Sequence, residues 1–131
     1  MRYLDPSAIV KLIIREPETA ELVASLRRDP VVVSSALALT EVPRAAKRAG
    51  LRGRRANQVL AGLALVPVDD GILRAAAELG SSTLRTLDAI HLATALSLQP
   101  DIDELVTYDP RVAQASMRAG LPVSAPGAVQ I

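Results

Sequence analysis

The stretch Val31-Val32-Val33-Ser34 decides which fold the sequence predicts. It is β-branched and apolar but too short for a helix, which is the pattern of a strand buried on both faces of a sheet. Further short segments that we predict to be strands occur at residues 2–4, 65–68, 104–107 and 122–124. Segments with helical patterning separate these runs, so we expect an α/β fold with a parallel sheet of about five strands flanked by helices.

Helix signals fill the segments between the strands. Apolar residues recur there at helical spacing, and prolines and glycines close the segments. We expect helices over residues 7–15, 18–28, 36–49, 54–64, 70–79, 87–98 and 110–119, and a loop at Ser81-Ser82. The residues expected to cap helix N-termini are Ser35, Asp69 or Asp70, Thr86 and Asp109.

The composition bounds the class of protein. A length of 131 residues suits one globular domain, so we expect residues 1–131 to form a single domain. Zero cysteines exclude disulfides, thiolate nucleophiles and cysteine-based zinc sites, and a single histidine, His91, removes most histidine-based metal sites. No apolar run approaches the ~18 residues of a membrane span. We therefore expect a cytoplasmic protein without a membrane segment.

Positive charge is concentrated in one part of the chain. Between residues 42 and 68 there is no acid, although the whole chain carries a net charge of only +1. The bases in this segment are Arg44, Lys47, Arg48, Arg52, Arg54 and Arg55. A solvated helix face is the ordinary explanation of such a run, and a phosphate-attracting surface is the alternative.

Four acids occupy positions where a parallel sheet binds ligands. Asp5 follows the first predicted strand and Asp109 follows the fourth, and ligands of open parallel sheets bind beyond the carboxyl ends of the strands. Glu41 lies in the helix after the second strand, and Asp88 lies in the first turn of an almost entirely apolar helix. The distances between these acids depend on the strand order, which the sequence leaves open.

Each acid also has an ordinary structural explanation. Asp5 and Asp109 both precede a proline, which is the pattern of an N-cap followed by proline at the first helical position. Glu41 alone fits a solvated helix residue. Asp88 alone fits an acid favoured by the helix dipole, with His91 three residues later as a candidate partner.

The four acids together favour a metal-dependent hydrolysis. Carboxylates without cysteine or histidine companions suit Mg²⁺ or Mn²⁺, and a basic helix face beside such a site suits the phosphates of a nucleic acid. A metal-bound water supplies the hydroxide that cuts a phosphodiester. Glycine-rich phosphate loops and a Gly-x-Ser-x-Gly elbow are absent from the sequence, which disfavours nucleotide binding and serine hydrolysis.

Four stretches of the sequence resemble the motifs of VapC-type PIN-domain toxins. They are Tyr-Leu-Asp-Pro-Ser-Ala-Ile-Val-Lys-Leu at 3–12, Leu-Thr-Glu-Val-Pro-Arg-Ala at 39–45, Arg-Thr-Leu-Asp-Ala-Ile-His-Leu-Ala-Thr-Ala at 85–95 and Val-Thr-Tyr-Asp-Pro-Arg-Val-Ala at 106–113. The resemblance spans the chain in order. It implies a PIN-like three-layer sandwich and a Mg²⁺- or Mn²⁺-dependent endoribonuclease. It also implies the toxin of a type II toxin–antitoxin pair, a homodimer silenced by a VapB-like antitoxin.

The same resemblance implies the site residues. The metal-binding and catalytic acids are Asp5, Glu41, Asp88 and Asp109, and the hydroxyl residues that support them are Ser7 and Thr107. We expect RNA to be bound by Arg44, Lys47, Arg48 and Arg52. The alternative is a catalytically silent PIN-like module that binds RNA or protein. Pro43 is expected to kink the helix near Glu41, because it cannot donate to the carbonyl of Leu39.

Overall fold

A five-stranded parallel sheet runs through the middle of the computed structural model, which describes residues 1–80 and 83–128. Its strands are β1 (Arg2–Leu4), β2 (Val32–Ser35), β3 (Ala64–Val66), β4 (Glu104–Val106) and β5 (Val123–Ser124). They lie in the order β3-β2-β1-β4-β5, and every pairing is parallel. The prediction of an α/β fold with about five parallel strands is confirmed.

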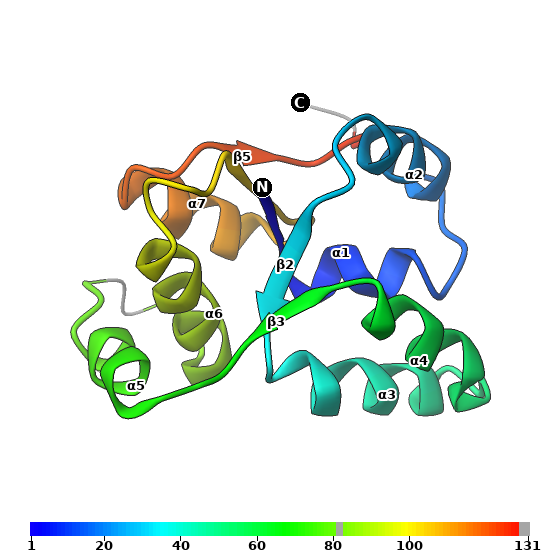
Figure 1. Ribbon diagram of the computed structural model, residues 1–131, viewed down its shortest axis with the longest axis horizontal. Coiled ribbons are helices and arrows are strands. Elements are labelled where there is room, and N and C mark those ends of the chain that lie inside the picture. Colours follow the sequence, from blue (N-terminus) through cyan, green and yellow to red (C-terminus); the bar gives the residue numbers. More distant parts are fainter. Residues whose placement is uncertain (81–82, 129–131) are drawn as a thin grey trace.

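Helices cover both faces of this sheet. In chain order they are α1 (Pro6–Lys11), α2 (Thr19–Arg28), α3 (Ala38–Arg48), α4 (Gly53–Ala61), α5 (Asp70–Ala77), α6 (Thr86–Ser97) and α7 (Pro110–Arg118). Helices α1 to α4 lie on one side of the sheet and α5 to α7 on the other (Figure 1). The result is the predicted three-layer sandwich. No helix among the described residues has the length and apolarity needed to cross a membrane.

The central strands supply side chains to a separate core on each face. Leu4 and Val106 pack with α1, α3 and α4, whereas their neighbours Tyr3 and Leu105 pack with α6 and α7. Successive side chains of a strand point to opposite faces, so a strand covered on both sides is apolar at most positions. This requirement explains why the strands read as continuous apolar runs in the sequence.

The strand order places a topological switch point between β1 and β4. The chain moves from β1 to β2 and β3 in one direction, and then returns to place β4 on the other side of β1. The backbone N–H of Asp5 donates to the carbonyl of Val106 over 3.0 Å, which fixes the end of β1 against the end of β4. Parallel sheets bind ligands at such a point.

Several helix ends differ from the prediction. Ser35 is the last residue of β2 rather than an N-cap, and its Oγ accepts from the backbone N–H of Leu37 over 3.1 Å. Thr86 lies inside α6, whose N-cap is Arg85. Asp69 caps α5 as expected, with Oδ1 2.8 Å from the N–H of Ile72. The predicted loop at Ser81-Ser82 lies outside the described residues.

Two other boundaries have clear local causes. Helix α1 ends at Lys11 instead of residue 15, and the hydroxyl of Thr19 donates to the Lys11 carbonyl over 2.8 Å. Strand β3 ends before Pro67, which has no N–H to give to a neighbouring strand. Helix α3 continues through Pro43 as a single element from Ala38 to Arg48, so this proline does not break it.

Candidate active site

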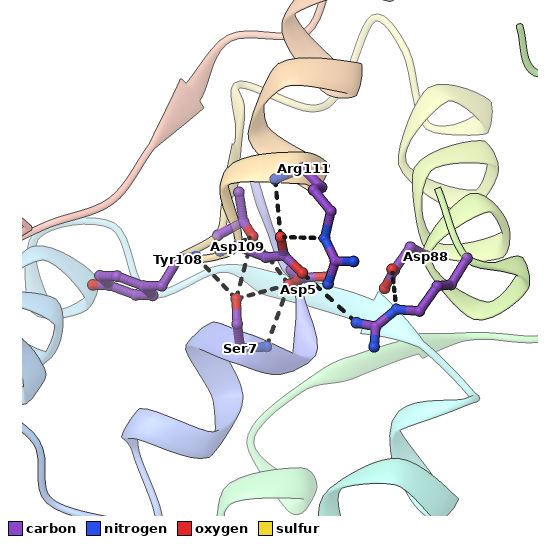
Figure 2. Close-up of polar contacts among 8 residues, drawn as sticks. Asp5, Ser7, Asp88, Tyr108, Asp109 and Arg111 are labelled. Atoms are coloured by element: carbon purple, nitrogen blue, oxygen red, sulfur yellow. Dashed lines mark hydrogen bonds and ion pairs between the residues drawn. The ribbon is translucent and has the colours of Figure 1, made fainter. Parts of the chain in front are cut away.

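Asp5 lies at the bottom of the site and is 2% exposed. Its Oδ2 accepts two hydrogen bonds from Ser7, one from the hydroxyl over 2.7 Å and one from the backbone N–H over 3.3 Å (Figure 2). The same oxygen accepts a third hydrogen bond from the Thr107 hydroxyl over 3.0 Å. Oδ1 of Asp5 is buried and has no hydrogen-bond partner among residues 1–80 and 83–128. Burial raises the pKa of Asp5 above its usual value, although the hydroxyl donors act in the opposite direction.

The two hydroxyls that hold Asp5 also tie β1 to β4. The Ser7 hydroxyl accepts from the backbone N–H of Tyr108 over 2.9 Å, and the Thr107 hydroxyl accepts from that of Asp109 over 3.1 Å. Each hydroxyl therefore donates to the carboxylate and accepts from the backbone after β4. The structure thus brings Ser7 and Thr107 together with Asp5, where the sequence placed them as supporting residues.

Asp88 and Asp109 share an arginine. The Nε of Arg85 lies 3.2 Å from Oδ2 of Asp88, and its Nη2 lies 3.8 Å from Oδ2 of Asp109. Asp109 is the N-cap of α7, and its Oδ1 accepts from the backbone N–H of Arg111 over 2.9 Å (Figure 2). The capping explanation is therefore correct for Asp109, as it is for Asp5 at α1. Neither cap role removes the carboxylates from the site.

Glu41 has a partner that the sequence did not predict. Its Oε1 lies 2.6 Å from Nε2 of His91, and Nδ1 of that histidine lies 2.7 Å from the hydroxyl of Tyr3. His91, which contacts Glu41, and Tyr3, which contacts His91, are both fully buried. The candidate pairing of His91 with Asp88 is wrong: Asp88 pairs with Arg85, which precedes it by one helical turn.

The acids do not form a ready-made metal cage in the part of the chain that the structure describes. No three aspartate, glutamate or histidine side chains gather there closely enough to hold an ion together. Asp5 contributes an unpartnered oxygen, and Arg85 supplies positive charge to Asp88 and Asp109. The site therefore combines an acceptor that lacks a partner among the described residues with two carboxylates whose cationic partners, Arg85 and Arg111, are exposed side chains.

Comparison with known proteins places this chain in a family. The family model for the PIN domain matches residues 2–116. The chain belongs to the VapC-type PIN-domain family. Ribonuclease VapC46 of Mycobacterium tuberculosis is 50% identical over 125 residues, covering 95% of this chain and 96% of the relative. Ribonuclease VapC47 of the same species is 38% identical over 136 residues, covering 99% and 100%.

Solved structures of the same fold include a chain of a toxin–antitoxin complex from Klebsiella pneumoniae. It superposes on this PIN domain with a TM-score of 0.74 and 23% identity, covering 100% of both chains. The likeness extends over every layer of the sandwich. It therefore supports the PIN fold across the whole chain.

A cleft of about 700 Å³ adjoins the acidic site of this PIN domain, and Ser7 and Glu41 are in its lining. The lining does not include Asp5, Asp88 or Asp109, and its second acid is Glu16. Its basic lining residues are Lys11, Arg44 and Arg48. Of the four side chains predicted to bind RNA, Arg44 and Arg48 thus lie in the cleft, whereas Lys47 and Arg52 are exposed outside its lining.

Sequence reasoning missed three cations near the acids: Arg85, Lys11, and Arg111, whose Nε lies 3.6 Å from Oδ1 of Asp109. Arg85 stands three residues before Asp88 at the start of a helix, and this spacing is a signal that could have identified the pair. Lys11 gave no such signal for its position over the ring of Tyr108, because the two residues are far apart in the chain. Its Nζ lies 4.7 Å from the ring centroid and 2.9 Å from Glu18.

Proposed function

We propose that this chain is a Mg²⁺- or Mn²⁺-dependent endoribonuclease that acts as the toxin of a type II toxin–antitoxin pair. The observation that carries the proposal is the buried, unpartnered Oδ1 of Asp5 at the switch point of the sheet. A buried polar atom without a partner is costly, and a cation is the natural partner of a carboxylate oxygen. The names of VapC46 and VapC47 as ribonucleases support the activity.

The donor set fits a hard divalent cation. The candidate ligands are carboxylate oxygens, which Mg²⁺ and Mn²⁺ prefer. Asp5, Asp88 and Asp109 would hold the ion, with Glu41 beside them. When bound, such an ion supplies a hydroxide from water and neutralises charge on the scissile phosphate. In the absence of an ion, Arg85 pairs with Asp88 and Asp109, and Arg111 pairs with Asp109 as well.

The protein's own residues orient the acids and the RNA. Ser7 and Thr107 fix the carboxylate of Asp5 through short hydrogen bonds, so it is held in place before substrate arrives. Arg44 and Arg48 line the cleft and are positioned to hold phosphates near the acids. Lys47 and Arg52 lie outside the cleft lining, where they add to the long-range attraction of RNA.

The expected partners follow from the same proposal. A VapB-like antitoxin would silence the enzyme, and the likeness to a chain of the Klebsiella toxin–antitoxin complex supports such a partner. We also propose that the protein forms a homodimer and that it acts in the cytoplasm, where its RNA substrate is present.

The test is cleavage of total cellular RNA by purified protein freed of any antitoxin. Reactions contain Mg²⁺, Mn²⁺ or EDTA, and Asp88→Asn serves as the inactive control. Discrete metal-dependent fragments that disappear in the control are expected. Intact RNA from folded protein that still binds RNA would instead support the silent binding module.

A further inference from the structure

We propose that His91, held by Tyr3, is a positioning residue that orients Glu41 toward the metal site. This inference rests on the proposed function, because it concerns how the acidic site is prepared for its ion. The geometry behind it is a continuous chain of short contacts: 2.7 Å from the Tyr3 hydroxyl to Nδ1 of His91, and 2.6 Å from Nε2 of His91 to Oε1 of Glu41.

The chain of contacts has a defined donor direction. An ionised carboxylate only accepts hydrogen bonds, so Nε2 of His91 carries the proton that bonds to Glu41. In a neutral ring Nδ1 then accepts, and the Tyr3 hydroxyl donates to it. Burial raises the pKa of Tyr3, so the phenol keeps its proton and remains a donor. Both ring nitrogens are therefore satisfied inside the core.

This arrangement uses one oxygen of Glu41, and within the part of the chain that the structure describes the side chain makes no other hydrogen bond. Glutamate is a long side chain that loses rotamer freedom when it is fixed, and the histidine bond imposes that loss before any ion binds. Glu41 lies on α3, whereas His91 lies on α6, one turn beyond Asp88. Helix α6 thus carries both Asp88 and His91, the residue that contacts Glu41.

A purely structural histidine makes a different prediction from a positioning one. If His91 serves only to fill the core, its replacement lowers stability but leaves the metal affinity of the folded protein unchanged. If it orients Glu41, its loss also weakens metal binding, by about 10- to 100-fold for partners that orient a ligand. Metal affinity measured without RNA therefore separates the two roles.

The experiment compares two amide replacements that imitate different ring nitrogens. The amide nitrogen of His91→Gln stands near the position of Nε2 and preserves a donor to Glu41, whereas His91→Asn reaches only as far as Nδ1. Free Mn²⁺ is titrated by electron paramagnetic resonance at a temperature where thermal melts show every variant to be folded. We expect His91→Asn to weaken Mn²⁺ binding by about 10-fold or more and His91→Gln to restore most of it.

Further variants guard against a folding effect. Ser25→Ala removes a buried hydrogen bond to Arg2 at the opposite end of β1. This variant should therefore lose stability without any change at the acidic site, which makes it the control for a general loss of stability. Tyr3→Phe removes only the phenol oxygen and replaces His91→Asn if that variant does not fold. In a Glu41→Gln background, His91→Asn should add no further loss of Mn²⁺ affinity, because the two residues act through one contact.

The outcomes distinguish this inference from the proposed function. Wild-type affinity for Mn²⁺ in folded His91→Asn, or in folded Tyr3→Phe when the asparagine variant does not fold, would overturn the positioning role alone. Absence of Mn²⁺ binding by the wild-type protein itself would overturn the proposed metal site, and the positioning role with it. Equal losses in the asparagine and glutamine variants would also contradict a role that depends on the Nε2 donor.

Discussion

The floor of the acidic site, formed by Asp5, Ser7 and Thr107, differs from its rim, formed by Arg85, Asp88 and Asp109. In the floor, neutral hydroxyls hold a carboxylate that is 2% exposed. In the rim, a guanidinium whose side chain is 67% exposed bridges two carboxylates. The floor therefore keeps its negative charge uncompensated, whereas the rim balances its charge with a side chain that water already surrounds.

This difference indicates which part of the site a bound cation would stabilise more. Hydroxyl donors orient the Asp5 carboxylate but do not cancel its charge, so burial still raises its pKa. Arg85 is screened by solvent and exchanges its partners at little cost. A divalent ion would therefore stabilise the floor more than the rim.

The largest expected effect is the loss of cleavage in Asp5→Asn. Because Asp5 is a proposed metal ligand, its removal should eliminate several kcal/mol of transition-state stabilisation, and activity should fall by about 100-fold or more. The same change should raise the melting temperature of the metal-free protein at pH 7, because a buried uncompensated charge is removed. Calorimetry in EDTA and an RNA cleavage assay measure the two effects.

Asp69→Asn is the matched control for this change. Asp69 also caps a helix through its side chain, but at α5, outside the site. Asparagine caps helices about as well as aspartate, so neither activity nor stability should change appreciably. A lower melting temperature for Asp5→Asn in EDTA would contradict the description of the floor as an uncompensated charge.

Thr107→Val tests how strongly the hydroxyls hold the floor. The substitution keeps the shape of the side chain but removes the donor to Asp5 and the acceptor for the N–H of Asp109. Because one of these bonds is to a charged group, we expect a loss of about 1–3 kcal/mol in unfolding free energy, measured by urea denaturation. Thr94→Val, which loses a neutral bond to the Ile90 carbonyl and a neutral contact with the Tyr3 hydroxyl, should cost less. Equal losses would show that the charge of Asp5 adds nothing.

The pH dependence of stability should reveal the floor. Because the folded-state pKa of Asp5 is raised, its contribution to stability is fully present below its unfolded pKa of about 3.9 and is lost as the pH rises through the folded value. The stability advantage of Asp5→Asn in EDTA should therefore be small in acid and grow toward neutral pH. Urea denaturation of both proteins across this range measures the difference. An advantage that is independent of pH would have another cause.

The smallest effect is expected at the rim. Arg85→Gln removes exposed ion pairs with Asp88 and Asp109, and such pairs are screened by salt. The variant should be slightly less stable than the wild type at low ionic strength and indistinguishable from it in about 1 M NaCl. Thermal melts of the metal-free proteins at both salt concentrations test this. A loss that persists in high salt would mean that the rim is as rigid as the floor.

The sequence by itself determined the elements and the chemical character of the site. Short apolar runs predicted the strands, and Asp5 and Asp109 were recognisable as N-caps because a cap contacts residues only a few positions away. The motifs around Asp5, Glu41, Asp88 and Asp109 indicated the family. The predictions that Ser35 and Thr86 are N-caps were wrong. A hydroxyl residue near a helix start can accept a backbone hydrogen bond without being the cap, as Ser35 does, or can lie inside the helix, as Thr86 does.

Only the tertiary structure decided which of these residues meet. Thr107 reaches Asp5 across 102 positions of the chain because β4 pairs with β1, and no local pattern fixes that strand order. The same packing gives Glu41 its contact with His91 and places Arg44 in the cleft but not Lys47. Local physics selects strands, helices and caps, whereas the burial of both sheet faces selects their arrangement, and that arrangement assembles the site.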